Sequence, residues 1–146
     1  MDIEQIVQML IPTVKEVIGG MLMMSDSGVI GGMREAGAIA KYLKSGAQEL
    51  GGNPIIGGLV EGLLGEGGSL ELPDITAIDV TTLFNKVGSA ANALSGVEGG
   101  DQVKQFIYGL AEQIAGAAGG GLFGGGQKFS AGEQQYLEGL RAMLGV

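Results

Sequence analysis

Two groups of acidic residues are the side chains in this sequence that could hold a metal ion. The first group is Asp26, in the segment "MLMMSDSGVI", with Glu35 in the helical pattern that follows. Their carboxylates, together with carbonyl oxygens of the turn, are ligands that Ca²⁺ accepts, but a calcium site needs about six to eight oxygens. The alternative is that Ser25, Asp26 or Ser27 caps the next helix by accepting hydrogen bonds from its free N–H groups.

The second group surrounds "SLELPDITAID", the one stretch without helical periodicity. Glu71, Asp74 and Asp79 lie in it, and an irregular loop can direct carboxylates and backbone carbonyls toward one ion. Their spacing differs from that of an EF-hand loop, so a solvated acidic connector is the competing interpretation. Either group would take Ca²⁺ or Mg²⁺, because a chain without Cys and His offers oxygen ligands.

The same absences exclude most enzyme chemistry. Without His the chain lacks the most common general base, and without Cys it has no thiolate nucleophile. The segment "GGGLFGGG" shares only its glycines with a phosphate-binding P-loop, which follows a strand and ends in Gly-Lys-Ser/Thr. We therefore expect a protein without enzymatic activity.

The glycine-rich loop 119–127 contains a candidate interaction site. Leu122 and Phe123 are large apolar residues between glycine triplets, an arrangement that favours contact with a partner protein or a membrane surface. The alternative is that both side chains fold back onto the rest of the protein.

Composition indicates one folded domain with an acidic surface. Of the 146 residues, 45% are hydrophobic and 16% are charged, which is enough apolar material for a core. The net charge of −8, without a basic cluster, disfavours nucleic acid and anionic membranes as partners. The start "MDIEQIVQML" is acidic where a signal peptide is basic, and the longest charge-free stretch, 113–127, is too short and glycine-rich to span a membrane. We expect a soluble, cytoplasmic protein.

Helical periodicity covers most of the chain. Apolar residues at helical spacing run from Ile3 to Met21 and include Pro12, which predicts either one kinked helix or two. A second helix is predicted from Ser27 to about Leu50. The predicted N-caps of the later helices are Asn53 (with Pro54 at the first helical position), Asp79, Asp101 and Ser130.

These elements predict an all-α fold, a single bundle of about six or seven helices. Its halves are 1–68 and 79–146, joined by the connector 69–78. In the third helix Gly58 and Gly62 stand one turn apart, which predicts close packing there and the approach of another backbone.

The two halves share a pattern that resembles a known family. Each has a helix, a short polar or glycine turn, and a helix opened by Ser and Glu. This is similar to the TerB-like domain of tellurite-resistance proteins, all-α folds whose turns have the form Ala-Asp-Gly-x-x-Ser-x-x-Glu. The closest match is "FSAGEQQYLEGL", with Ser130 and Glu133 in the Ser and Glu places, whereas "AAGGGLFGGG" stands where the family has Asp-Gly. The resemblance implies divalent cations held by acidic residues and a stress-response role at the inner face of the membrane.

The sequence therefore predicts a non-enzymatic interaction or scaffold domain of the stress-response type, which binds protein partners or itself and binds a divalent cation weakly. The alternative is a membrane-associated or self-assembling protein, in which small-residue faces such as Gly58/Gly62, Ala36/Ala40 and Ala111/Ala115 mediate helix association. Charged residues within the long helices, such as Lys15 and Arg34, favour the first interpretation.

Overall fold

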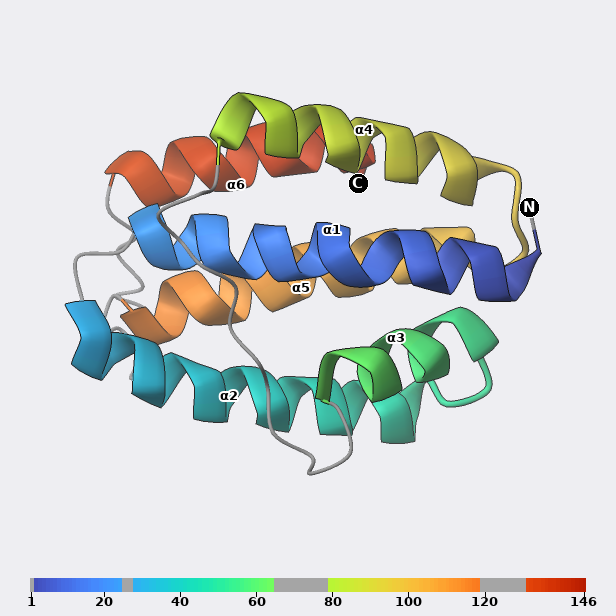
Figure 1. The fold of residues 1–146 in the computed structure, drawn as a ribbon, viewed down its shortest axis with the longest axis horizontal. Helices are drawn as coiled ribbons and strands as arrows, with labels where there is room; N and C mark the ends of the chain where they lie inside the picture. Colours follow the sequence, from blue (N-terminus) through green and yellow to red (C-terminus); the bar gives the residue numbers. More distant parts are fainter. Residues whose placement is uncertain (1, 25–27, 65–78, 119–130) are drawn as a thin grey trace.

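The computed structural model describes residues 2–24, 28–64, 79–118 and 131–146 (Figure 1). These residues form six α-helices and no strand. In chain order the helices are α1 (Ile3–Met24), α2 (Gly28–Glu49), α3 (Pro54–Leu64), α4 (Val80–Ser95), α5 (Gly100–Ala118) and α6 (Ala131–Leu144). The predicted all-α bundle is confirmed.

The helices lie in three layers, with α1 and α5 in the middle (Figure 1). α4 and α6 cover one side of this pair, and α2 and α3 cover the other. α1 contacts α3, α4, α5 and α6. Most of its predicted apolar stripe is accordingly buried, with Leu10, Val14 and Ile18 fully inaccessible, whereas Ile3 at its start is 44% exposed. Burial of each such side chain contributes about 1.5–3 kcal/mol relative to exposure, so α1 is the central element of the core.

Pro12 lies inside α1, which continues through it as one helix. A proline lacks the N–H that would bond to the carbonyl four residues earlier, here that of Gln8. Both Pro12 and Gln8 are exposed, so water can satisfy that carbonyl. Of the two predicted arrangements, the structure has the single helix.

Side chains of α1 pack against two glycines of α3. A methyl group added at Gly62 would collide with the side chain of Ile11, and one added at Gly58 would lie 3.1 Å from a methyl of Val7. The close packing predicted at Gly58 and Gly62 is thus confirmed, but side chains of α1 approach these glycines where another backbone was predicted. This packing places two side chains of α1 against the backbone of α3.

Of the four predicted N-caps, two are confirmed, one is wrong, and Ser130 lies outside the described residues. Asn53 caps α3 and Asp79 caps α4, each through side-chain oxygens that accept backbone N–H groups. α5, however, begins at Gly100, so Asp101 lies in its first turn. The carbonyl that accepts the first helical bond, from the Val103 N–H, belongs to Gly99. Gly99 has a φ of +80°, a conformation that a glycine adopts at little cost.

A tyrosine joins α2 to α5, and we call this the Tyr42 contact. The Tyr42 hydroxyl donates to the carbonyl of Phe106 at 3.1 Å, and the two rings stack with centroids 5.2 Å apart. A methyl group at Gly46 would collide with the Phe106 ring, and one at Gly109 would collide with the Tyr42 hydroxyl. Each helix therefore supplies one aromatic ring and the glycine that makes room for the other.

A second tyrosine joins α6 to α1 and α4, and we call this the Tyr136 contact. The Tyr136 hydroxyl donates to the carbonyl of Val17 at 2.9 Å, and its ring lies 5.5 Å from that of Phe84. A methyl group at Gly20 would lie 2.6 Å from the Tyr136 oxygen, and one at Gly139 would lie 2.7 Å from the Phe84 ring. The whole residue is 2% exposed, and this burial raises the pKa of Tyr136 far above its ordinary value of 10.0, with a smaller contribution from the Glu16 carboxylate.

Candidate functional site

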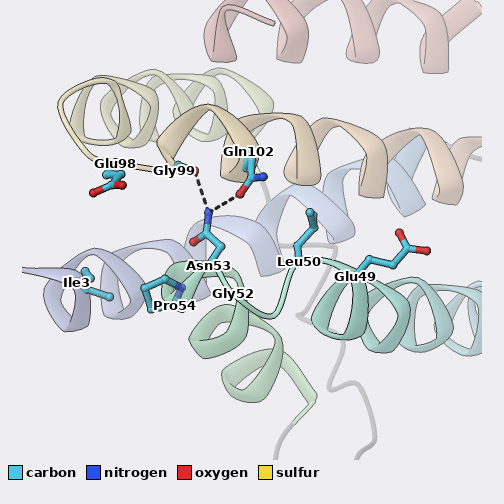
Figure 2. A pocket seen from close by; sticks show the side chains of 9 residues that line it. All are labelled: Ile3, Glu49, Leu50, Gly52, Asn53, Pro54, Glu98, Gly99 and Gln102. Carbon is cyan, nitrogen blue, oxygen red and sulfur yellow. Dashed lines mark hydrogen bonds between the residues drawn. The ribbon is translucent and has the colours of Figure 1, made fainter.

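A hollow lies at one end of the bundle, where the α2–α3 loop meets the α4–α5 loop (Figure 2). We call it the loop hollow. Its volume is about 500 Å³. It is lined by Ile3, Glu49, Leu50, Gly52, Asn53, Pro54, Glu98, Gly99 and Gln102.

Asn53 fixes the two loops relative to each other. It is 7% exposed, and its Oδ1 accepts the N–H groups of Ile55 (3.0 Å) and Ile56 (3.4 Å) at the start of α3. Its Nδ2 donates to the Gly99 carbonyl at 3.0 Å and to Gln102 Oε1 at 3.1 Å (Figure 2). The amide thus uses all four of its hydrogen-bonding positions within the protein, so Asn53 shapes the hollow and is not available to a ligand.

The exposed side chains that line the loop hollow are acidic or apolar, apart from the neutral amide of Gln102. Glu49 ends α2 and Glu98 lies in the α4–α5 loop, and both are exposed. Figure 2 shows their side chains at opposite ends of the hollow, with Ile3, Pro54 and Leu50 along it. No Lys or Arg is among the described residues that line it. The hollow can therefore accept a cation and an apolar group together.

Little of either predicted metal site falls in the described part of the chain. Asp26, Glu71 and Asp74 lie outside it, as does the side chain of Glu35, whose backbone belongs to α2. The carboxylate of Asp79 is described, and its two oxygens accept hydrogen bonds from the Thr81 N–H at 3.0 Å and the Thr82 hydroxyl at 3.1 Å. No group of three or more acidic side chains that could hold a metal is found among the described residues. The metal site stays a prediction.

The other predicted interaction site, Leu122 and Phe123, also lies outside the described residues. Within the described ranges, no helix has both the length and the apolar composition that crossing a membrane requires. The membrane-associated alternative would be tested at the glycine-rich loop 119–127.

Among the described residues, the pair formed by buried Lys104 and exposed Ser95 most resembles catalytic chemistry. Lys104 is 8% exposed, and its ammonium donates to the Ser95 hydroxyl at 2.8 Å. In nucleophilic catalysis the serine would give its proton to a base, but here Ser95 donates to the carbonyl of Ala91 at 2.9 Å. The pair instead places a positive charge at the C-terminal end of α4, where the helix dipole stabilises it.

A second hollow, of about 460 Å³, lies between α1 and α4. Lys86 of α4 and Glu16 of α1 line it and form an ion pair at 2.9 Å. Their side chains are 49% and 29% exposed, so solvent screens the pair and it contributes at most about 1 kcal/mol. Because the two charges neutralise each other, this hollow lacks the net charge of the loop hollow.

Sequence reasoning did not single out Glu49, Glu98 or Ile3. A weak signal was present, because both loops carry a Glu, two glycines and an Asn or Asp, in "ELGGN" at 49–53 and "EGGD" at 98–101. What the sequence did not indicate is that the two loops meet, since Asn53 and Gln102 are 49 residues apart.

Comparison of the chain with protein-family models, with curated proteins and with solved structures gives no match.

Proposed function

We propose that the protein is a non-enzymatic interaction domain, and that its loop hollow binds a basic, partly apolar segment of a partner protein. The observation that carries this proposal is the lining of the hollow, in which exposed Glu49 and Glu98 flank apolar side chains without a neighbouring Lys or Arg. Such a surface attracts a positively charged segment and repels an acidic one.

The apolar part of the hollow also supports a protein partner. Ile3 and Met143 are the large hydrophobic residues that are strongly exposed in the described part of the chain, at 44% and 41%, and Ile3 lines the hollow. A side chain of this kind gains free energy when a partner covers it. Because the hydrogen bonds of Asn53 already hold both loops in place, binding would order little of the protein and so lose little entropy.

The proposal is tested by NMR titration of the ¹⁵N-labelled protein with two acetylated, amidated peptides of equal length. One alternates Leu with Arg, and the other alternates Leu with Glu. We expect the first peptide to shift the amide signals of Gly52 and Gly99, and the second to shift neither. Replacement of both Glu49 and Glu98 by Gln should weaken binding of the first peptide about two- to fivefold per charge.

Glu138→Gln is the control for the effect per charge, because it removes one carboxylate from an exposed position of α6. It should leave the affinity within experimental error. Shifts spread evenly over the acidic surface, with equal weakening by the control, would mean that the peptide binds by net charge alone and would overturn the proposal.

We propose that such a partner acts in a stress response, the role that the TerB resemblance implies. Weak binding of Ca²⁺ or Mg²⁺ is a separate part of it, carried by Asp26 and Glu35 or by Glu71, Asp74 and Asp79. An ion with a dissociation constant of about 10 μM, present at about 1 mM, should add about 2.7 kcal/mol to the free energy of unfolding. Thermal melts in EDTA and in each ion, repeated with Asp26→Asn, separate the first group from the second.

A further inference from the structure

A third hollow continues the loop hollow along the seam between α2 and α5. Its volume is about 280 Å³, and it is lined by Tyr42, Leu50, Gln102, Gln105 and Phe106. Leu50 and Gln102 also line the loop hollow. The two hollows therefore adjoin at Leu50 and Gln102. We call the pair the groove, and its lining extends from Ile3 to the rings of the Tyr42 contact.

The aromatic wall of this groove is fixed before any ligand arrives. The Tyr42 and Phe106 rings lie 22° from parallel, and the Tyr42 hydroxyl is held by the Phe106 carbonyl. Phe106 is 4% exposed, whereas Tyr42 is half-buried and so keeps part of its surface open to the groove. An aromatic surface that is already ordered binds a flat group at a small entropic cost.

The surroundings of Tyr42 are negative as well as apolar. Burial raises the pKa of the Tyr42 phenol, and the carboxylates of Glu112 and then Glu49 raise it further. The phenol is thus uncharged at neutral pH, while carboxylates on both helices of the seam act on the same ring. Gln102 and Gln105 are exposed along α5 and provide amide oxygens that accept hydrogen bonds.

We propose that the groove binds an extended, arginine-bearing peptide segment, with one guanidinium group against Tyr42 and a second basic residue between Glu49 and Glu98. A guanidinium is flat, stacks on an aromatic ring and can donate to carboxylate and amide oxygens at the same time. A lysine ammonium carries the same charge but has no flat face, so the aromatic wall selects arginine over lysine. This inference rests on the proposed function, because it names the partner chemistry of the same site.

The test compares the Leu/Arg peptide with a Leu/Lys peptide of equal length and charge, and with spermidine, by NMR titration of the intact chain. We expect the arginine peptide to bind about two- to fivefold more tightly than the lysine peptide, and to shift the amide signals of Gln105 and Phe106 in addition to those of Gly52 and Gly99. Spermidine should bind more weakly than either peptide.

Two variants test whether the aromatic wall causes the preference for arginine over lysine. Tyr42→Leu should bind both peptides equally, while Gly52 and Gly99 still shift, and Tyr42→Phe should keep the preference for arginine. Should Tyr42→Leu fail to fold, as shown by its thermal melt, Glu112→Gln at an exposed position tests whether a cation lies beside Tyr42 and should weaken binding of both peptides about twofold. The comparison of the two peptides with the wild-type protein still tests the selectivity. Glu138→Gln again serves as the control.

The outcomes separate this inference from the proposed function. Equal binding of the arginine and lysine peptides by the wild-type protein, with shifts at Gly52 and Gly99, would overturn the arginine selectivity and keep the loop hollow as a cation-binding surface. Spermidine binding as tightly as the peptides would likewise overturn it. Binding of neither peptide would overturn both.

Discussion

The Tyr42 contact and the Tyr136 contact are built in the same way at two places in the bundle. In each, a tyrosine hydroxyl donates to a backbone carbonyl of a neighbouring helix, and a glycine three residues further along that helix makes room for the hydroxyl. In each, the tyrosine ring packs on a phenylalanine whose edge lies over a glycine of the tyrosine's own helix.

The two contacts differ in their surroundings. Tyr136 is 2% exposed and joins three helices, because its phenylalanine, Phe84, comes from α4. Tyr42 joins two helices and lies half-buried beside a hollow. The comparison teaches that the same tyrosine–glycine–phenylalanine arrangement can have two roles. At Tyr136, where solvent is excluded, it stabilises the core, and at Tyr42, beside the groove, it presents a fixed aromatic surface.

Removal of each ring gives the largest expected difference. Tyr136→Ala should lower the free energy of unfolding by about 3–5 kcal/mol, as for other buried aromatic residues. Tyr42→Ala should cost about half as much, because part of the Tyr42 ring is already in contact with water. Urea unfolding at pH 7 measures both values. Equal losses would show that the two contacts do not differ in their structural role.

Substitution of the glycines that lie next to the two tyrosine hydroxyls tests the same comparison. Gly20→Ala places a methyl group 2.6 Å from the Tyr136 oxygen and 3.0 Å from a methyl of Leu83. Overpacking in a closed core costs about 1–3 kcal/mol, partly offset by the better helix propensity of alanine, so we expect a net loss of about 1–2 kcal/mol. Gly109→Ala should cost only about 0.5 kcal/mol, because Tyr42 is half-buried and its displacement disturbs fewer packed neighbours than that of Tyr136. A larger loss at Gly109, seen in the same urea experiment, would contradict this explanation.

At alkaline pH the phenols of Tyr136 and Tyr42 should differ in their effect on the free energy of unfolding. In the unfolded chain a tyrosine ionises near pH 10, and burial raises the pKa of Tyr136 in the folded protein. Below pH 10 both states are protonated and the stabilisation is complete. Above that pH the unfolded state loses its proton first, so the free energy of unfolding falls by up to about 1.4 kcal/mol per pH unit for each such phenol.

Urea unfolding between pH 9 and 12 should therefore show a shallower fall in Tyr136→Phe than in the wild-type protein. Tyr42→Phe should reduce the fall over a narrower pH range, because the Tyr42 ring is less deeply buried. A wild-type stability that stays constant up to pH 12 would contradict the burial of both hydroxyls.

Loss of the hydroxyls alone gives the smallest expected effect. A buried hydrogen bond contributes about 0.5–1.5 kcal/mol, so Tyr136→Phe should cost about 1 kcal/mol and Tyr42→Phe about 0.5 kcal/mol at pH 7. Double-mutant cycles with Gly20→Ala and Gly109→Ala would show whether each hydroxyl and its glycine act as a unit. Additive losses at both places would mean that the glycines do not serve the hydroxyls.

Local sequence features predicted the helices because their causes lie within a few residues. The apolar spacing of α1, the Asn53–Pro54 start of α3 and the Asp79 cap of α4 each depend on neighbours in the chain. The Asp101 cap was mispredicted because Gly99 lies in the left-handed region, and its carbonyl accepts both the Val103 N–H and the Asn53 amide. The second of those bonds is a tertiary contact.

The groove could not be predicted for the same reason. Its walls come from the end of α2, the start of α5 and the loops between helices, and the Tyr42–Phe106 contact spans 64 residues. The sequence does contain the aromatic and acidic residues, but nothing local distinguishes Tyr42 from Tyr136, whose ring is buried in the core. Only the packing of α5 against α2 places Tyr42 at the surface of the groove.

Chemical labelling of Lys104 can report when the corner between α4 and α5 opens. An amine-reactive reagent meets Lys41, Lys44 and Lys86 at exposed positions, whereas Lys104 is held by Ser95 and is 8% exposed. Its acylation requires the corner between α4 and α5 to open, so its labelling rate follows the free energy of that opening. Because this corner carries Glu98 and Gly99, a bound peptide that holds the loops together would slow the labelling of Lys104 and leave the other three rates unchanged.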